Sequence, residues 1–89
     1  MLSKSATVGS RVGLHARPAT LLAESVQSEG IEVEIARDGD DDFVDASSVL
    51  MILTLGASHG DTVTIRSEEA TAEQLAKIAM LIESDLDAE

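Results

Sequence analysis

The sequence predicts an α+β fold in which an antiparallel sheet carries its helices on one face. Two observations identify the elements: some segments alternate apolar and polar residues, as strands do, and others repeat apolar residues three and four positions apart, as helices do. A third observation is their order along the chain, β-α-β-β-α-β-α. The chain has 89 residues with no internal repeat or linker, so we expect a single domain, residues 1–89.

The first strand is predicted at residues 5–8, which are β-compatible and precede Gly9. The first helix should follow and end before Gly30. Its expected buried face consists of Ala19, Leu22, Ala23 and Val26. A proline disfavours helical conformation in the residue before it, so the first helical residue is placed between Ala16 and Pro18.

Residues 31–36 alternate apolar and polar side chains and predict a strand with one wet face. A turn at residues 37–42 and a short strand beginning at residues 43–44 would complete a hairpin. The acidic run in this turn does not fit a calcium loop, because the twelfth residue counted from Asp38 is Val49 rather than glutamate. We therefore expect a solvated turn and no bound metal.

The second helix is predicted at residues 49–55, with N-cap candidates before it and Gly56 as its C-cap. This helix is apolar all round, although a two-layer domain covers only one side of a helix. Some of its side chains should remain exposed, which is typical of a partner-binding surface. The alternative is that loops cover them.

The last strand is predicted at residues 61–66, with Val63 and Ile65 facing inward. Thr71 and Gln74 fit the capping box that begins many helices. The third helix should then run to about Ser84, with a buried face made of Leu75, Ile78, Ala79 and Ile82.

The composition restricts the partners and the setting. Seventeen acidic residues against six basic ones give a formal net charge of -11, so the basic patch that nucleic-acid binding requires is missing. Self-repulsion of this size is best tolerated in concentrated salt, which suggests a halophilic source; an ordinary acidic protein is the alternative. There is no cysteine and no membrane-length apolar run, so we expect a cytoplasmic protein without membrane insertion.

The motif that most clearly indicates a functional site is Gly-Leu-His-Ala-Arg-Pro-Ala-Thr at residues 13–20. It places His15 where a helix begins, and unpartnered N–H groups and the helix dipole stabilise a phosphate-sized anion there. The positive helix end also favours the uncharged, nucleophilic imidazole. The guanidinium of Arg17 matches phosphate oxygens. Capping or surface roles are the alternatives, and His59 is interpreted as a turn residue.

This motif resembles the active-site signature of the HPr family, the histidine-containing phosphocarriers of the phosphoenolpyruvate-dependent sugar phosphotransferase system. Residues 44–56 resemble the second helix of the family, with Ser47 and Ser48 before the apolar run and Thr-Leu-Gly after it. The resemblance implies an open-faced β-sandwich whose four antiparallel strands are ordered 1-4-2-3, with three helices on one face.

The resemblance also implies a function. His15 would accept a phosphoryl group on Nδ1 from Enzyme I and donate it to a sugar-specific Enzyme IIA, as a monomeric carrier without a cofactor. Arg17 and the backbone N–H groups of Ala16 and Arg17 would form the phosphate pocket. The implied partner-binding residues are Ala16, Thr20, Val49, Leu50 and Leu53.

In many relatives a dedicated kinase phosphorylates the serine that matches Ser48, and Ser47 is an adjacent candidate here. Here Ser47 replaces the usual basic residue and Met51 a common glycine, so a plain N-cap role for Ser48 is the alternative. Two further functions stay open. One is a regulatory binding module of the same fold, although such relatives typically lack the histidine. The other is a carrier for a nitrogen-regulation or dihydroxyacetone branch.

Overall fold

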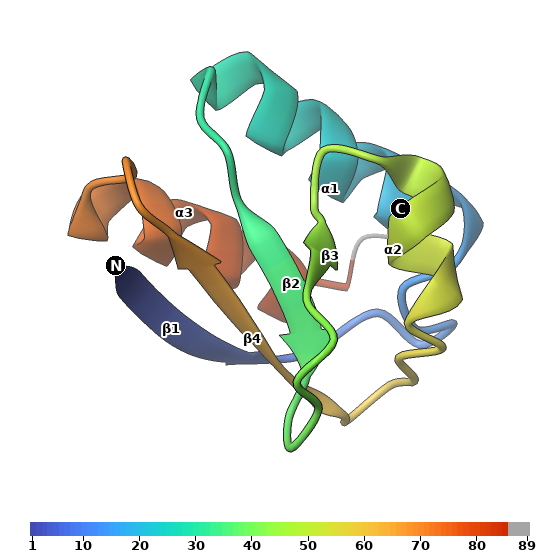
Figure 1. The fold of residues 1–89 in the computed structure, drawn as a ribbon. Coiled ribbons are helices and arrows are strands. Elements are labelled where there is room, and N and C mark those ends of the chain that lie inside the picture. Colours follow the sequence, from blue (N-terminus) through green and yellow to red (C-terminus); the bar gives the residue numbers. More distant parts are fainter. Residues whose placement is uncertain (86–89) are drawn as a thin grey trace.

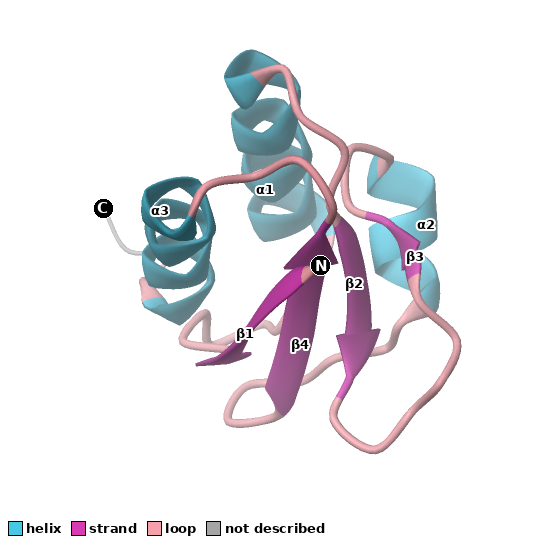
Figure 2. Ribbon diagram, turned by 60° about the vertical axis from the view of Figure 1, so that its left-hand side comes forward, coloured by secondary structure: helices cyan, strands magenta, loops and turns pink. Residues whose placement is uncertain are grey.

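The computed structural model describes residues 1–85 and confirms the predicted fold class (Figures 1 and 2). All strand pairs of the four-stranded sheet are antiparallel, in the order β1-β4-β2-β3. The elements are β1 (Leu2–Thr7), α1 (Ala16–Glu29), β2 (Glu34–Arg37), β3 (Val44–Asp45), α2 (Val49–Thr54), β4 (Thr62–Ser67) and α3 (Ala72–Glu83). Residues 86–89 of the predicted domain lie outside the described residues.

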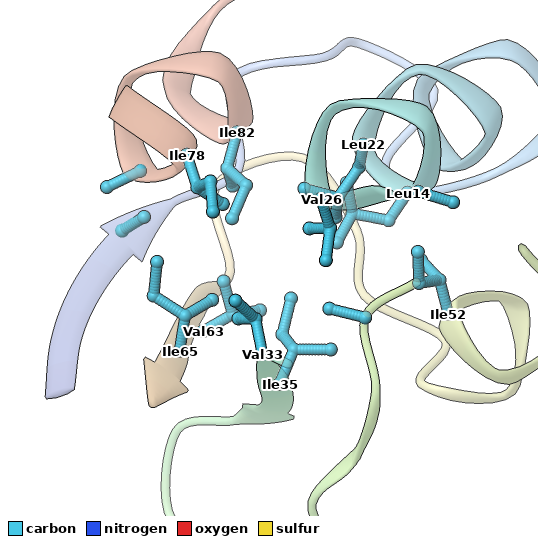
Figure 3. Packing of buried hydrophobic residues seen from close by; sticks show 14 of the residues in the cluster. Leu14, Leu22, Val26, Val33, Ile35, Ile52, Val63, Ile65, Ile78 and Ile82 are labelled. Carbon is cyan, nitrogen blue, oxygen red and sulfur yellow. The ribbon is translucent and has the colours of Figure 1, made fainter. Parts of the chain in front are cut away.

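The three helices lie on one face of the sheet (Figure 2), and the core fills the space between the two layers. Figure 3 shows α1 and α3 directing branched side chains toward the sheet, while Ile52 of α2 closes one end of the core. Both predicted helical stripes are buried, at Ala19, Leu22, Ala23 and Val26 and at Leu75, Ile78, Ala79 and Ile82. The 3.6-residue period of the sequence therefore orients both long helices correctly.

The end of α1 and the start of α3 also agree with the sequence-based prediction. Gly30 ends α1 in the left-handed conformation, with φ of 68°, and its N–H donates to the carbonyl of Gln27. The capping box at the start of α3 is present, with Thr71 and Gln74 each accepting a hydrogen bond from the other's backbone N–H. The predicted end of α2 is wrong by one residue, because α2 ends at Thr54 with Leu55 as its C-cap, and Gly56 follows in the left-handed conformation, with φ of 61°.

The predicted strand boundaries are wrong in the hairpin. β2 begins at Glu34 rather than at Ile31, because side chains from the end of β4 and from the turn after it bind the preceding backbone. The hydroxyl of Ser67 donates to the carbonyl of Glu32 at 2.6 Å, and the N–H of Glu32 donates to Glu69 at 2.6 Å. These side-chain bonds replace the ladder bonds of a strand. Val33 is nevertheless buried, as the alternation predicts.

The other strands shift by a few residues. β1 begins at residue 2 and ends at Thr7, because the whole segment pairs with β4 as far as Ser67. β3 begins one residue later than predicted, at Val44. No helix among the described residues has the length and apolar character needed to cross a bilayer.

Candidate functional site

The loop that carries His15 is held against the turn between α2 and β4. The N–H of Leu14 donates to the carbonyl of Ala57 at 2.9 Å, and the Leu14 side chain is buried. Gly13 has φ of 75° and packs so closely on Ala57 that a side chain there would overlap its carbonyl oxygen. Glycine is required at this position by both conformation and space. The loop therefore enters α1 at a fixed angle.

A second contact fixes the beginning of the same loop against the end of α3. The N–H of Gly9 donates to the carbonyl of Ile82 at 3.0 Å, and a side chain at Gly9 would overlap the backbone of Glu83. Arg11 forms an ion pair with Asp85 at 3.1 Å. The loop before His15 is thus clamped between two elements that are distant in sequence, as the course of the chain in Figure 1 illustrates.

His59 belongs to this clamp and lies in an exposed turn, as predicted. Its Nδ1 lies 3.2 Å from the carbonyl oxygen of buried Ser10, which also accepts from the N–H of Gly13 at 3.0 Å. A carbonyl only accepts hydrogen bonds, so Nδ1 must carry the hydrogen in this contact. His59 therefore contacts the loop before His15 through Ser10.

His15 is exposed and occupies the N-cap of α1, in extended conformation with φ of -118° and ψ of 164°. Its side chain caps no N–H within the described residues, so the imidazole takes no part in capping this helix. The next residue, Ala16, has a φ of 41°, which is a left-handed conformation. A non-glycine residue held there costs about 1–3 kcal/mol, and such residues cluster at functional sites.

The first turn of α1 offers donors to an anion. Pro18 has no N–H, and the N–H of Ala19 reaches the carbonyl of His15 only at 3.4 Å. The N–H groups of Ala16 and Arg17 precede that proline at the positive end of the helix. Thr20 is half-buried, and its hydroxyl donates to the carbonyl of Ala16 at 3.1 Å, which adds a hydrogen bond to this first turn.

The exposed side chain of Arg17 completes the group, so the structure brings His15, Ala16 and Arg17 together at one helix start. An imidazole, a guanidinium and the donors of a helix end can together hold a tetrahedral dianion. Within the described residues no group of three metal-binding side chains occurs. An open cavity of about 570 Å³ lies elsewhere, between the start of β2 and the end of β4, and does not include His15.

The helix α2 lies beside α1 (Figure 1), and Gln27 near the end of α1 donates to the carbonyl of Ser47, just before α2, at 2.8 Å. Ser48 is the N-cap of α2 and accepts the N–H of Met51 at 3.3 Å. Ser47 donates both its N–H and its hydroxyl to Asp45. The capping role proposed for Ser48 is thus present, and phosphorylation at either serine stays a prediction.

The predicted exposure of α2 is confirmed. Only Ile52 of this helix is fully buried, Val49 and Leu53 are half-buried against the core, and Leu50 is 73% exposed. Sequence reasoning missed Val12, which is 47% exposed on the loop before His15. Its signal was available: an apolar residue between Arg11 and Gly13 belongs to no strand or helix pattern that would bury it.

Comparison with known proteins agrees with this geometry. The model of the family described as "PTS HPr component phosphorylation site" matches residues 2–84. The chain belongs to the HPr family. It is therefore similar to phosphocarrier proteins of the phosphotransferase system.

Relatives and solved structures of the HPr family cover most of the chain. The phosphocarrier protein HPr of Streptomyces coelicolor is 38% identical over 82 residues, covering 88% of this chain and 87% of the relative. That of Haloferax volcanii is 35% identical over 72 residues, covering 81% of each. The crystal structure of HPr from Bacillus anthracis has a TM-score of 0.80 at 30% identity, covering 91% of this chain and 95% of the other.

Proposed function

We propose that His15 carries a phosphoryl group between Enzyme I and a sugar-specific Enzyme IIA, within the cytoplasm. The observation that supports this most strongly is an exposed histidine at a helix start that no side chain caps among the described residues, with Arg17 two residues away. An anion has both access and donors there. No other described helix leaves its N-cap side chain without a capping hydrogen bond.

In the first half-reaction, the lone pair of Nδ1 forms a bond to phosphorus while the bond from phosphorus to the donor's histidine breaks. The imidazole of His15 must be uncharged for this, with its hydrogen on Nε2. Arg17 and the N–H groups of Ala16 and Arg17 stabilise the charge on the phosphoryl oxygens. Transfer to Enzyme IIA repeats these steps in reverse.

The carrier supplies only half of each reacting site, and the partner supplies the rest. Phosphoryl transfer depends mainly on positioning and charge stabilisation, so the two halves must dock accurately. We assign docking to Ala16 and Thr20 of α1 and to Val49, Leu50 and Leu53 of α2. A monomer leaves this face open to both partners in turn.

The test is phosphorylation by Enzyme I and labelled phosphoenolpyruvate, comparing the wild type with His15→Ala. We expect acid-labile label on the wild type only, because a phosphorus–nitrogen bond is formed at His15. His59 remains in the variant, so label retained there would assign the reaction to His59 instead. An NMR spectrum of His15→Ala checks that the fold is intact.

Regulation through a serine kinase is a second proposal. The Ser48 hydroxyl caps α2 and borders Leu50, so a phosphate there would place charge on the docking face. The same modification would support the alternative of a regulatory binding module. A carrier for a nitrogen-regulation or dihydroxyacetone branch would keep His15 and change only the partner.

A further inference from the structure

The turn between α2 and β4 lies against the loop before α1 (Figure 1) and is joined to it by backbone hydrogen bonds. The carbonyl of Ala57 accepts the N–H of Leu14 at 2.9 Å. At the other end of the loop, the N–H of Val8 donates to the carbonyl of Asp61 at 2.8 Å, and the carbonyl of Val8 accepts the N–H of Gly60 at 2.9 Å. These three bonds attach both ends of the loop to the turn.

Between these ends the loop forms a tight turn of its own, and the side chain of His59 reaches it. The carbonyl of Ser10 accepts the N–H of Gly13 at 3.0 Å, and Nδ1 of His59 lies 3.2 Å from the same oxygen. A carbonyl oxygen has two lone pairs and can accept both hydrogens. The hydroxyl of Ser10 is buried and makes no hydrogen bond within residues 1–85. It is therefore the carbonyl of Ser10, not its side chain, that ties the tight turn to His59.

The backbone that carries His59 has a fixed direction. The N–H of Ser58 donates to Oδ2 of Asp61 at 2.9 Å, and the N–H of Asp61 donates to the carbonyl of Ser58 at 3.0 Å. Asp61 also forms an ion pair with Arg37 at 3.6 Å. Gly60 has a φ of 88°, which lets the chain reverse between these bonds. His59 thus lies inside a closed turn that directs its imidazole toward the loop.

We propose that His59 is a positioning residue for phosphoryl transfer at His15. This inference rests on the proposed function. His59 acts through the loop, because its Nδ1–H bond to Ser10 holds the tight turn that ends at Gly13, two residues before His15. A small displacement of a reacting group slows a reaction strongly. The two histidines then carry their hydrogens on different nitrogens: Nδ1 in His59, which donates to the fold, and Nε2 in His15, which reacts.

The first arm of the test compares His59→Leu with His59→Asn. The two side chains have nearly the same shape, but only asparagine has an N–H at the δ position that can donate to Ser10. The measurements are kcat and KM for phosphorylation by Enzyme I. We expect kcat to fall ~3- to 10-fold in His59→Leu and to stay near the wild-type value in His59→Asn, with KM unchanged in both.

Two kinetic outcomes would overturn the proposal. Equal kcat values for His59→Leu and His59→Asn would show that the hydrogen bond to Ser10 does not position His15. A raised KM with an unchanged kcat would make His59 a contact residue for the partner instead.

The second arm separates positioning from stability. Thr71→Ala removes the cap of α3, and Ser10→Ala removes the hydroxyl but keeps the carbonyl that His59 contacts. Both variants should keep the wild-type kcat at a temperature where they are folded, which circular dichroism checks. If Thr71→Ala loses as much kcat as His59→Leu, the loss is one of stability and the proposal is wrong. An equal loss in Ser10→Ala would assign the effect to the hydroxyl, which also contradicts it.

The third arm does not depend on Enzyme I. Nitrogen-15 NMR in alkaline solution, where imidazole is uncharged, identifies the nitrogen that carries the hydrogen. We expect Nδ1 for His59, and a hydrogen on Nε2 would overturn the proposal. The N–H of Leu14 should exchange with solvent faster in His59→Leu than in His59→Asn, because the loop opens more often; equal exchange rates would contradict it.

Failure of the proposed function is distinguishable from failure of this inference. If Enzyme I does not phosphorylate the wild type, the proposed function is wrong and the positioning role is refuted with it. If the wild type is phosphorylated and His59→Leu is as fast as His59→Asn, only the positioning role of His59 is wrong.

Discussion

Two helix starts in this molecule are built in opposite ways. At α3, Thr71 accepts the N–H of Gln74 at 3.1 Å and Gln74 accepts the N–H of Thr71 at 2.9 Å, so the first donors are satisfied internally. At α1, His15 caps nothing within the described residues and Pro18 removes one donor altogether. A helix start whose first N–H donors are paired by caps stabilises the fold, whereas a start whose donors are left available can bind an anion.

The open start of α1 has an energetic cost. A capping side chain typically contributes about 1 kcal/mol, and His15 does not provide it. The left-handed Ala16 adds strain, with φ of 41°. Such a start persists because the loop before it is clamped at Gly13 and Gly9. Rigid support from elsewhere thus holds an arrangement that α1 would not adopt as an isolated helix.

The largest effect should be that of Arg17→Ala on the rate of phosphoryl transfer at the start of α1. Removing the guanidinium deletes a charge-assisted contact with the phosphoryl group, which is worth about 1.5–3 kcal/mol. The rate of transfer from phosphorylated Enzyme I should fall ~10- to 100-fold. The measurement is the initial rate of label transfer.

The control for this variant is Arg37→Ala, which removes an exposed cation paired with Asp61 at 3.6 Å, away from the start of α1. It should leave the rate near that of the wild type. If the two variants slow the reaction equally, Arg17 acts only through the net charge of the protein, and its assigned role is wrong.

Exchanging the two kinds of helix start gives the next effect in size. His15→Ser supplies a capping hydroxyl and should stabilise the protein by up to about 1 kcal/mol, while Thr71→Ala should destabilise it by about 1 kcal/mol. For a domain of this size each change moves the Tm by about 4–8 °C. Thermal unfolding followed by circular dichroism measures both shifts.

The two variants should rank in the opposite order when phosphorylation rather than stability is measured. Thr71→Ala should still be labelled by Enzyme I, whereas His15→Ser should not give an acid-labile product. A His15→Ser protein that is no more stable than the wild type would mean that the start of α1 cannot use a cap. The open donors would then be a consequence of the Ala16 conformation alone.

Local patterns were sufficient for the parts of the fold that depend on neighbours in sequence. The buried stripes of α1 and α3 and the capping box at Thr71 were all predicted, because helical period and caps are properties of a few adjacent residues. The start of β2 was not, because Ser67 and Glu69 bind the backbone of Glu32 from more than thirty residues away. Such contacts have no local signature.

The candidate site divides in the same way. His15 and Arg17 could be found from eight consecutive residues, since helix start, imidazole and guanidinium are adjacent in the chain. The sequence also indicates that Val12 belongs to no buried strand or helix pattern, but the position of the loop that leaves it 47% exposed depends on how Gly13 packs against Ala57.

The smallest effect concerns the other end of α1, where Glu29 accepts a hydrogen bond from Lys77 of α3 at 2.8 Å. This bond lowers the pKa of Glu29 below its usual value of 4.5 and raises the pKa of Lys77 above its usual 10.5. The stabilisation by Glu29 is therefore complete above its ordinary pKa and is lost as the pH falls through the lowered folded value. That by Lys77 is complete below its ordinary pKa and is lost as the pH rises through the raised one.

The variant Lys77→Met removes this ion pair, and Lys4→Met is its control because it removes the same charge from β1. Urea unfolding at pH 7 should show Lys77→Met to be the less stable of the two. As the pH falls through the lowered pKa of Glu29, the difference should shrink, since protonation of Glu29 removes the ion pair with Lys77. A difference that stays constant with pH would show that Lys77 stabilises the helix pair by packing of its aliphatic chain rather than by its charge.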